Sequence, residues 1–266
     1  MQQELAIENS LLGLIQGITE WVPISSEGLV SLVSTLALHR GFEDAIELAL
    51  WLHIGTAASA LVYFKKEFLA IIKNRNSGNR DSVSLASFLI LSSIGTAVTG
   101  IPLILGLHAV SALSGSLIMI LIGALVVLNG LTQINRGDLL TPKKFDSINR
   151  LDSMLVGLVQ GLSILPGLSR SGLTISFLLL RKYDNENALY LSFLMSVPAS
   201  LGGVLLILIT REFSFQLEVF LGSIIAFLVG ILTIHLLLSV AKQIKFSLFL
   251  IISGIILILG GLIGLI

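Results

Sequence analysis

Long apolar runs dominate the chain, and six of them are predicted to be transmembrane helices. They cover about 46–64, 84–106, 111–131, 187–210, 217–240 and 245–266. A run of about 20 apolar residues is long enough to cross about 30 Å of hydrocarbon as a helix. Because the runs are continuously apolar and do not alternate with polar residues, they favour helices over the strands of a β-barrel. The expected fold class is an all-α polytopic membrane protein.

Two further segments, about 9–38 and 153–181, are apolar at both ends and polar in the middle. The first is interrupted at Glu20–Gly28 and the second at Pro166–Thr174. Proline and glycine beside hydroxyl side chains end helices, which leaves pieces of about 10–13 residues that are too short to cross the bilayer. We therefore expect two re-entrant helix–loop–helix elements, which are tolerated at membrane depth only where the loop is buried in protein or lines a wet cavity.

Lysine and arginine are concentrated on one side of this predicted topology. Threading the six spans and two re-entrant elements leaves only Arg40 and Arg211, among the basic loop residues, on the opposite side. The positive-inside rule makes the basic side cytoplasmic. Both chain ends are then expected outside, with the element at 9–38 entering from the outside and the element at 153–181 from the inside.

The two halves of the sequence resemble each other. Leu12–Thr19 recurs as Val156–Ser163. The residues that follow also match, after a shift of one position; they are Pro23 with Pro166 and Ser26 with Ser169.

Each half contains one re-entrant element and three spans, and because three is odd the second copy must be inverted in the membrane. We predict a single integral membrane domain, 1–266, with repeats at 9–131 and 153–266 and a cytoplasmic linker at about 132–152. Inverted repeats with broken helices place their site near the bilayer midplane, where half-helix ends converge.

Composition narrows the possible functions. Only 12% of the 266 residues are charged, about half the share of a soluble domain. The formal net charge of zero gives no support to nucleic-acid binding, and the absence of cysteine excludes disulfides and thiolate chemistry. The first residues carry Glu4 and Glu8 and no basic residue, so no cleavable signal peptide is expected.

Arg170 is the residue whose presence most needs an explanation. An arginine in hydrocarbon costs at least about 2.5–3.5 kcal/mol on insertion scales and marks a candidate functional site. Its guanidinium group is a bidentate fork suited to phosphate oxygens. The structural alternative is an ion pair with Glu20 or Glu27 inside the helix bundle.

New helices are predicted to begin after both breaks, near Ser25–Gly28 and Ser169–Gly172. Free N–H groups at a helix N-terminus form a natural seat for phosphate, and the hydroxyls there could equally be helix caps. Gln16 and Glu20 are four residues apart and share one helix face. Glu20 is the acidic side chain best placed to take a proton from a serine nucleophile, and a carboxylate beside phosphate suggests a bridging divalent cation, Mg²⁺ or Ca²⁺.

These breaks resemble two motifs of the undecaprenyl-diphosphate phosphatases, the BacA/UppP family. Gln16–Ser26 is similar to that family's (E/Q)xxxE…PxSS motif, and Pro166–Thr174 is similar to its PGxSRSxxT motif. The length, the arrangement of spans and the inverted repeats match as well, so the resemblance covers nearly the whole chain.

The resemblance implies a membrane hydrolase of cell-wall biogenesis and bacitracin resistance. It would remove the terminal phosphate from a long-chain polyprenyl diphosphate at the outer face of the cell membrane and regenerate the monophosphate carrier. On this model Gln16 and Glu20 are the metal or base residues, Ser26 is the nucleophile and Arg170 clamps phosphate. The remaining residues of the expected phosphate cradle are Ser25, Ser169, Ser171, Gly172 and Thr174.

One position departs from the family pattern. The family usually continues S-S-x-G-H, whereas Leu29 stands here where that histidine would be, and leucine cannot transfer a proton. Glu27 is one candidate to replace it in catalysis, or it pairs with Arg170 instead. His53, in an apolar span, is a reserve candidate, although a satisfied core histidine is the commoner situation.

Two other functions remain open from the sequence. Inverted repeats with re-entrant elements are also a transporter design, so a polyprenyl-phosphate lipid transporter or flippase is the alternative. A non-hydrolytic lipid-phosphate binder of the same fold is a third possibility. The bilayer and a polyprenyl diphosphate are the expected partners, and the sequence leaves open a homodimer.

Overall fold

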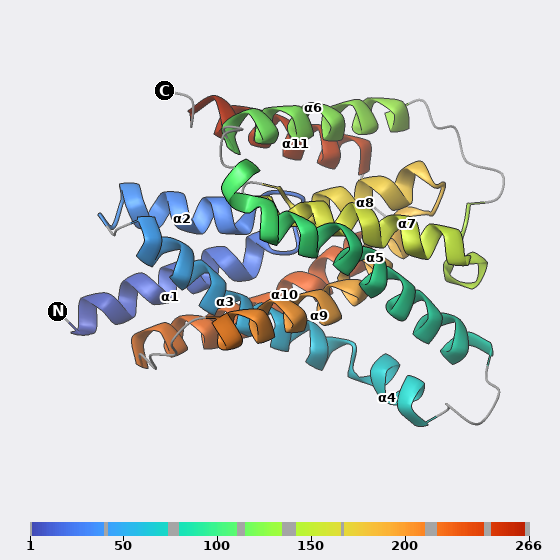
Figure 1. The fold of residues 1–266 in the computed structure, drawn as a ribbon, viewed down its shortest axis with the longest axis horizontal. Helices are drawn as coiled ribbons and strands as arrows, with labels where there is room; N and C mark the ends of the chain where they lie inside the picture. Colours follow the sequence, from blue (N-terminus) through green and yellow to red (C-terminus); the bar gives the residue numbers. More distant parts are fainter. Residues whose placement is uncertain are drawn as a thin grey trace. The chain divides into compact units, whose positions relative to one another are not determined.

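A computed structural model describes residues 2–39, 42–73, 80–110, 115–134, 142–165, 168–210, 217–241 and 246–263. Within these ranges the regular elements are all helical, which confirms the predicted fold class (Figure 1). Pro166 and Gly167 of the second motif lie outside the described residues, as do Arg40 and Arg211. The helices are α1 (Gln2–Thr19), α2 (Ser26–Leu36), α3 (Phe42–Tyr63), α4 (Lys65–Lys73), α5 (Arg80–Val110), α6 (Gly115–Ile134), α7 (Arg150–Gly161), α8 (Arg170–Leu180), α9 (Asn185–Thr210), α10 (Leu217–Val240) and α11 (Phe246–Ile263), with short 3₁₀ turns at Phe145–Ser147 and Leu162–Ile164.

Both predicted helix breaks are present. The first separates α1 from α2, and the second separates α7 from α8. The helices α2, α7 and α8 have 11, 12 and 11 residues, so each is roughly 17 Å long and too short to cross the hydrocarbon. The expected length was wrong for α1, which has 18 residues because the helix extends back to Gln2.

Three described helices are long and apolar enough to cross a membrane: Leu85–Leu105, Asn185–Leu205 and Val219–Val240. They fall on the predicted spans 84–106, 187–210 and 217–240. The other three predicted spans correspond to α3, α6 and α11, and their crossing of the bilayer stays a prediction.

The helices gather into two compact units. One comprises Met1–Trp21, Ser25–Lys65 and Ser196–Leu237; the other comprises Val22–Ile24, Lys66–Met195 and Leu238–Ile266. Each unit combines helices from both halves of the sequence. The repeat boundaries at 9–131 and 153–266 stay a prediction.

Glycines that recur between the halves allow close helix packing in both units. A Cβ added at Gly13 of α1 would collide with the backbone carbonyl of Gly222 in α10, and one added at Gly157 of α7 would collide with that of Ser92 in α5. In each case the first helix of a break lies against a long helix from the other half of the chain, as Figure 1 shows for α7 and α5. Small residues at such contacts let membrane helices approach closely.

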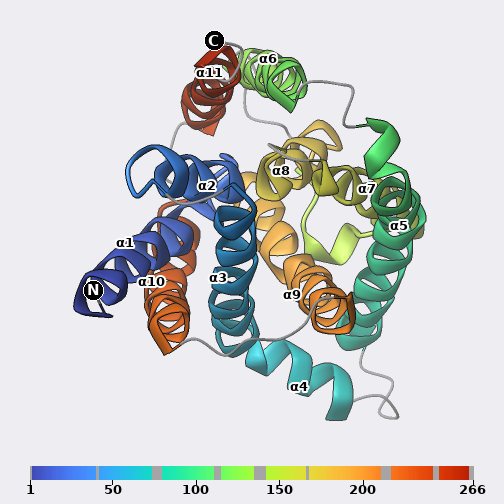
Figure 2. The ribbon, with the colours of Figure 1, turned by 60° about the vertical axis from the view of Figure 1, so that its left-hand side comes forward.

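The contact between α6 and α11 is reciprocal. A Cβ added at Gly123 would lie 2.7 Å from the carbonyl oxygen of Gly254, and one added at Gly254 would lie 2.6 Å from that of Gly123. The two helices lie side by side in both views (Figures 1 and 2). A two-fold axis generates contacts of this kind, since residue i then meets j and j meets i. The pair supports the predicted repeat relation of the two halves, which itself stays a prediction.

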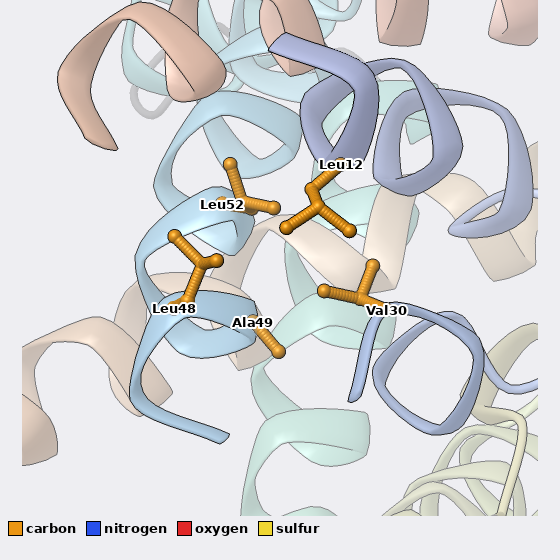
Figure 3. Close-up of a cluster of buried hydrophobic side chains, with 5 residues drawn as sticks. All are labelled: Leu12, Val30, Leu48, Ala49 and Leu52. Atoms are coloured by element: carbon orange, nitrogen blue, oxygen red, sulfur yellow. The ribbon is translucent and has the colours of Figure 1, made fainter. Parts of the chain in front are cut away.

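The core of the first unit is a cluster of aliphatic side chains from α1, α2 and α3. The five buried members point toward one another in Figure 3. They are Leu12, Val30, Leu48, Ala49 and Leu52. Their burial fixes the rotation of the three helices about their own axes, and therefore decides which residues one turn further along come together.

A buried carboxylate joins the two open ends of the α7–α8 hairpin. Asp152, in the first turn of α7, accepts hydrogen bonds from Arg181 Nε at 2.6 Å, Lys143 Nζ at 2.9 Å and the Tyr183 hydroxyl at 3.0 Å. Burial alone would raise the pKa of Asp152, but these hydrogen bonds outweigh it and hold the pKa below its ordinary value. The carboxylate is therefore ionised at neutral pH and fixes both ends of the hairpin.

We expect Gly157→Ala to lower the thermal unfolding midpoint of the detergent-solubilised protein. The new methyl group would displace the Ser92 backbone, and overpacking of this kind costs about 1–3 kcal/mol. Gly203→Ala is the matched control, because among the described residues nothing lies within 4 Å of a Cβ at Gly203. That variant should unfold at the same or a higher temperature, since alanine is the better helix former. Equal midpoints for the two variants would contradict the packing argument.

Candidate active site

The carboxylate of Glu20 is the centre of the first break. Glu20 directly follows α1 and keeps a helical hydrogen bond from its own N–H to the Gln16 carbonyl, at 3.0 Å. Its Oε2 atom accepts hydrogen bonds from Gln16 Nε2 at 3.0 Å and from Ser26 Oγ at 2.7 Å. All three side chains are buried. The structure therefore brings the predicted Gln16, Glu20 and Ser26 together in one hydrogen-bonded group.

The apolar core explains why these side chains meet. On each of α1, α2 and α3, a polar residue lies one helical turn from a member of the aliphatic cluster, so it projects from the same face. The pairs are Leu12 with Gln16, Val30 with Ser26, and Ala49 with His53. Packing of the cluster thus aligns three polar groups at one level.

His53 reaches the same carboxylate from α3. Its Nε2 atom lies 3.2 Å from Glu20 Oε2, and its Nδ1 atom lies 2.7 Å from the carbonyl oxygen of Ala49. A carbonyl oxygen only accepts, so Nδ1 carries hydrogen. The contact between Nε2 and Glu20 is then a hydrogen bond only when one further proton lies between the two atoms. The Glu20 Oε2 atom thus lies within 3.2 Å of a nitrogen of His53 and accepts the hydrogen bond from Ser26.

Glu27 lies next to His53, and its side chain is the most exposed of those around the Glu20 carboxylate. Its side chain is 48% exposed, and its Oε1 atom lies 3.7 Å from His53 Nε2. The sequence suggested Glu27 as a replacement for the missing motif histidine, and the structure places it beside another histidine. Its alternative pairing with Arg170 stays a prediction.

Both breaks end in the same serine cap. The Ser25 hydroxyl accepts from the Gly28 N–H at 3.1 Å, and the Ser169 hydroxyl accepts from the Gly172 N–H at 3.1 Å. Ser25, and not Ser26, is therefore the structural counterpart of Ser169. The number of residues between Ser25 and Ser169 is the same as the number between Gln16 and Gln160. The one-residue shift inferred from the sequence was wrong at this point.

This corrected register changes the comparison of the two breaks. The first residue of α2 is Ser26, and the first residue of α8 is Arg170. The expected nucleophile and the expected phosphate clamp thus occupy equivalent positions, each directly after its capping serine.

The first turn of α8 also holds the backbone of the other break. The Ser171 hydroxyl donates to the Val22 carbonyl at 2.8 Å and lies 3.2 Å from the Ser169 hydroxyl. A Cβ added at Gly172 would lie 3.4 Å from the Pro23 Cβ. The turn Val22–Ile24 therefore packs on the N-terminus of α8, which is how the second predicted motif contacts part of the first.

Thr174 is held inside the same unit. Its hydroxyl donates to the Arg170 carbonyl at 2.9 Å and lies 2.6 Å from the Ser192 hydroxyl in α9. The hydroxyls of Ser25, Ser169, Ser171 and Thr174 thus all have partners within the protein, and direct contact of any of them with a phosphate would require exchange of a partner. Their predicted role in phosphate binding stays a prediction.

The two repeated glutamines differ in their surroundings. Gln160 donates from Nε2 to the Thr96 hydroxyl at 2.9 Å and helps to hold α7 against α5. Gln16 donates to Glu20 instead, and its Oε1 atom is buried with no hydrogen-bond partner among the described residues. An unused carbonyl oxygen beside a carboxylate is a suitable ligand for Mg²⁺ or Ca²⁺.

The protein offers only part of a metal coordination shell at this point. Across the described ranges, no group of three or more histidine, aspartate or glutamate side chains is arranged to hold a metal ion. The predicted role of Gln16 and Glu20 as metal residues stays a prediction.

His53 is the site residue that the sequence indicated least clearly. It belongs to no recognisable motif, and Ala49, the residue that orients it, is one turn earlier in the same apolar helix. The available signal was an ionisable side chain inside an apolar run, which marks a candidate functional position in a membrane protein.

Comparison with known proteins agrees with these motifs. The model of the BacA family, described as bacitracin resistance protein BacA, matches residues 9–260. Proteins named undecaprenyl-diphosphatase are similar along almost their entire length. The protein from Haloarcula marismortui is 39% identical over 264 residues, 95% of this chain and 96% of the relative.

Two further relatives with the same name show the same coverage. The protein from Methanococcoides burtonii is 36% identical over 262 residues, 95% of this chain and 97% of the relative. The protein from Saccharolobus solfataricus is 33% identical over 265 residues, 96% of this chain and 95% of the relative.

Proposed function

The chain belongs to the BacA family of integral membrane proteins, and we propose on this basis that it is an undecaprenyl-diphosphatase-like hydrolase. Its substrate is a long-chain polyprenyl diphosphate, and its products are the polyprenyl monophosphate and inorganic phosphate. The observation that carries the proposal is the 2.7 Å hydrogen bond from the Ser26 hydroxyl to the buried Glu20 carboxylate, at the N-terminus of α2.

Ser26 and Glu20 have the arrangement of a nucleophile and its base. In the first step the Ser26 oxygen attacks the terminal phosphorus, its proton passes to Glu20, and the bond to the bridging oxygen breaks; Glu20 gives that proton to the departing monophosphate lipid and is again a base. In the second step water attacks the phosphoserine and gives its proton to Glu20, the bond between phosphorus and the serine oxygen breaks, and Glu20 returns the proton to that oxygen as inorganic phosphate leaves.

On this proposal the protein stabilises charge in two ways. The N–H groups in the first turn of α2 are a natural seat for phosphate oxygens. Arg170, at the equivalent position of α8, supplies a bidentate cation, and Ser169, Ser171, Gly172 and Thr174 shape the turn that presents it. Phosphoryl transfer requires mainly positioning and charge stabilisation of this kind.

A divalent cation would be held by Gln16 Oε1 and Glu20. Bound there, Mg²⁺ or Ca²⁺ would neutralise charge on the diphosphate oxygens. The proposal rests on the unused, buried Oε1 atom of Gln16.

In this chain Leu29 occupies the position of the motif histidine, and His53 takes over the role of that histidine. Its hydrogen bond to Glu20 orients the carboxylate toward Ser26. His53 does not need to contact the substrate for this, so we regard it as a positioning residue, and Glu27 extends the group on its open side.

The proposed site opens to the outer face of the cell membrane, with the prenyl tail between the spans and both chain ends outside. The basic loops support this orientation through the positive-inside rule. The transporter alternative gains no support from the relatives, because each of the three described above is named as a diphosphatase.

Glu20→Gln, Ser26→Ala and Arg170→Ala should each abolish most phosphate release from undecaprenyl diphosphate in detergent. Loss of a general base alone costs roughly 10²–10⁴-fold. Ser34→Ala is the matched control on α2, since Ser34 is buried but lies two turns from the site. Wild-type turnover in Ser26→Ala would exclude the serine nucleophile and indicate direct attack by water, whereas wild-type turnover in Glu20→Gln would contradict the proposed base.

His53→Leu should lower kcat by roughly 10–100-fold, the usual effect of losing an outer partner that orients a site residue. KM should change little, because the side chain does not bind substrate on this proposal. Adding Leu29→His should restore part of the rate. His235→Leu is the control, since His235 contacts Tyr63 away from the site. An unchanged kcat in His53→Leu would contradict the proposed positioning role of His53.

EDTA should suppress phosphate release, and added Mg²⁺ or Ca²⁺ should restore it. Gln16→Ala should raise the cation concentration needed for half-maximal rate, because one oxygen ligand is lost. Gln160→Ala, the repeated glutamine, should leave that concentration unchanged. Identical cation dependence in both variants would contradict the assignment of Gln16 as a ligand.

A further inference from the structure

The short helix α4 has a surface that the proposed reaction does not use. Its sequence is Lys-Lys-Glu-Phe-Leu-Ala-Ile-Ile-Lys, and none of its residues is buried. Leu69 is 48% exposed and Ile72 is 71% exposed. At 3.6 residues per turn these two side chains share a face with Phe68, while Lys66 and Lys73 share another. The helix is therefore amphipathic, and none of its residues is buried.

The charge on α4 is predominantly positive. Lys65, Lys66 and Lys73 are exposed. The single acidic side chain, Glu67, accepts a hydrogen bond from the Tyr190 hydroxyl at 3.4 Å. This contact directs the carboxylate toward the start of α9 and leaves Lys66 and Lys73 as the accessible charges of the polar face.

The position of α4 in the chain indicates what covers its apolar face. α3, a predicted span, ends at Tyr63, and α4 begins at Lys65. The apolar window of α5 begins only at Leu85. A helix that starts so close to the end of a membrane span lies at the bilayer surface, where an apolar face can enter the acyl region and lysines can extend to the headgroups.

We propose that α4 is an interfacial helix that binds anionic phospholipid. Leu69 and Ile72 enter the boundary of the acyl chains, and Lys66 and Lys73 contact lipid phosphates. The charge complementarity selects anionic over zwitterionic headgroups, because each lysine near a negatively charged surface strengthens binding by about fivefold. This surface is independent of the catalytic assignment, so either proposal can fail without the other.

The absence of cysteine allows a direct test of this placement. Ile72→Cys and Lys66→Cys each introduce a unique thiol for a bimane fluorophore, one on each face of the helix. In vesicles of phosphatidylcholine with phosphatidylglycerol, lipids brominated in the acyl chain should quench the label at position 72 and spare the label at position 66. Equal quenching at both positions, or none at position 72, would overturn the proposal. Energy transfer between labelled copies without lipid quenching would show that a second copy of the chain covers the face.

The lipid preference is tested separately with the double variant Lys66→Glu/Lys73→Glu. Native mass spectrometry of protein released from the mixed vesicles should show retained phosphatidylglycerol on the wild type and at least a tenfold loss on the variant. The matched variant Lys66→Arg/Lys73→Arg should retain the lipid. Both variants should keep the wild-type unfolding midpoint and phosphate release, since α4 is outside the catalytic group. Equal retention by the Lys→Glu variant and the wild type would overturn the proposed headgroup contacts.

Discussion

A broken helix in an apolar environment must satisfy its freed backbone groups within the protein, and the two breaks of this chain meet that requirement in the same way. Ser25 and Ser169 each cap the helix that follows, and Ser171 donates to the Val22 carbonyl inside the other break. Water is not available in hydrocarbon to replace these bonds. The residues that satisfy the backbone in this way are also those assigned to the phosphate cradle in the proposed function.

The buried Glu20 carboxylate depends on the apolar core beneath it. Leu12, Val30 and Ala49 fix the faces of three helices, and Gln16, Ser26 and His53 then reach one oxygen atom. A carboxyl group so far from water is tolerated only when it is hydrogen-bonded. Stability and function are linked here, because the donors that make burial of the carboxylate tolerable also orient it toward the serine hydroxyl.

Much of this arrangement was predictable from the sequence, because its signals are local. The apolar runs predicted the helices, and Pro23 with the flanking hydroxyls predicted the first break. Gln16 and Glu20 meet because four-residue spacing brings side chains together on any helix. His53 was harder to assign because its partner is in another helix, and no local pattern encodes that packing. The pairing of Ser26 with Ser169 was also wrong, since the letters Ser25-Ser26 align equally well in two registers and only the hydrogen bond to Gly28 distinguishes them.

The equivalence of Ser26 and Arg170 has a consequence for the ancestry of the protein. If the two halves arose by duplication, a symmetric dimer of single copies would carry the same side chain at both helix starts, either two hydroxyls or two guanidinium groups. Only two separate copies of the sequence can diverge, so that one carries the hydroxyl of Ser26 and the other the guanidinium group of Arg170. A site that combines these two groups, as in the proposed function, is therefore one that a homodimeric ancestor could not have possessed.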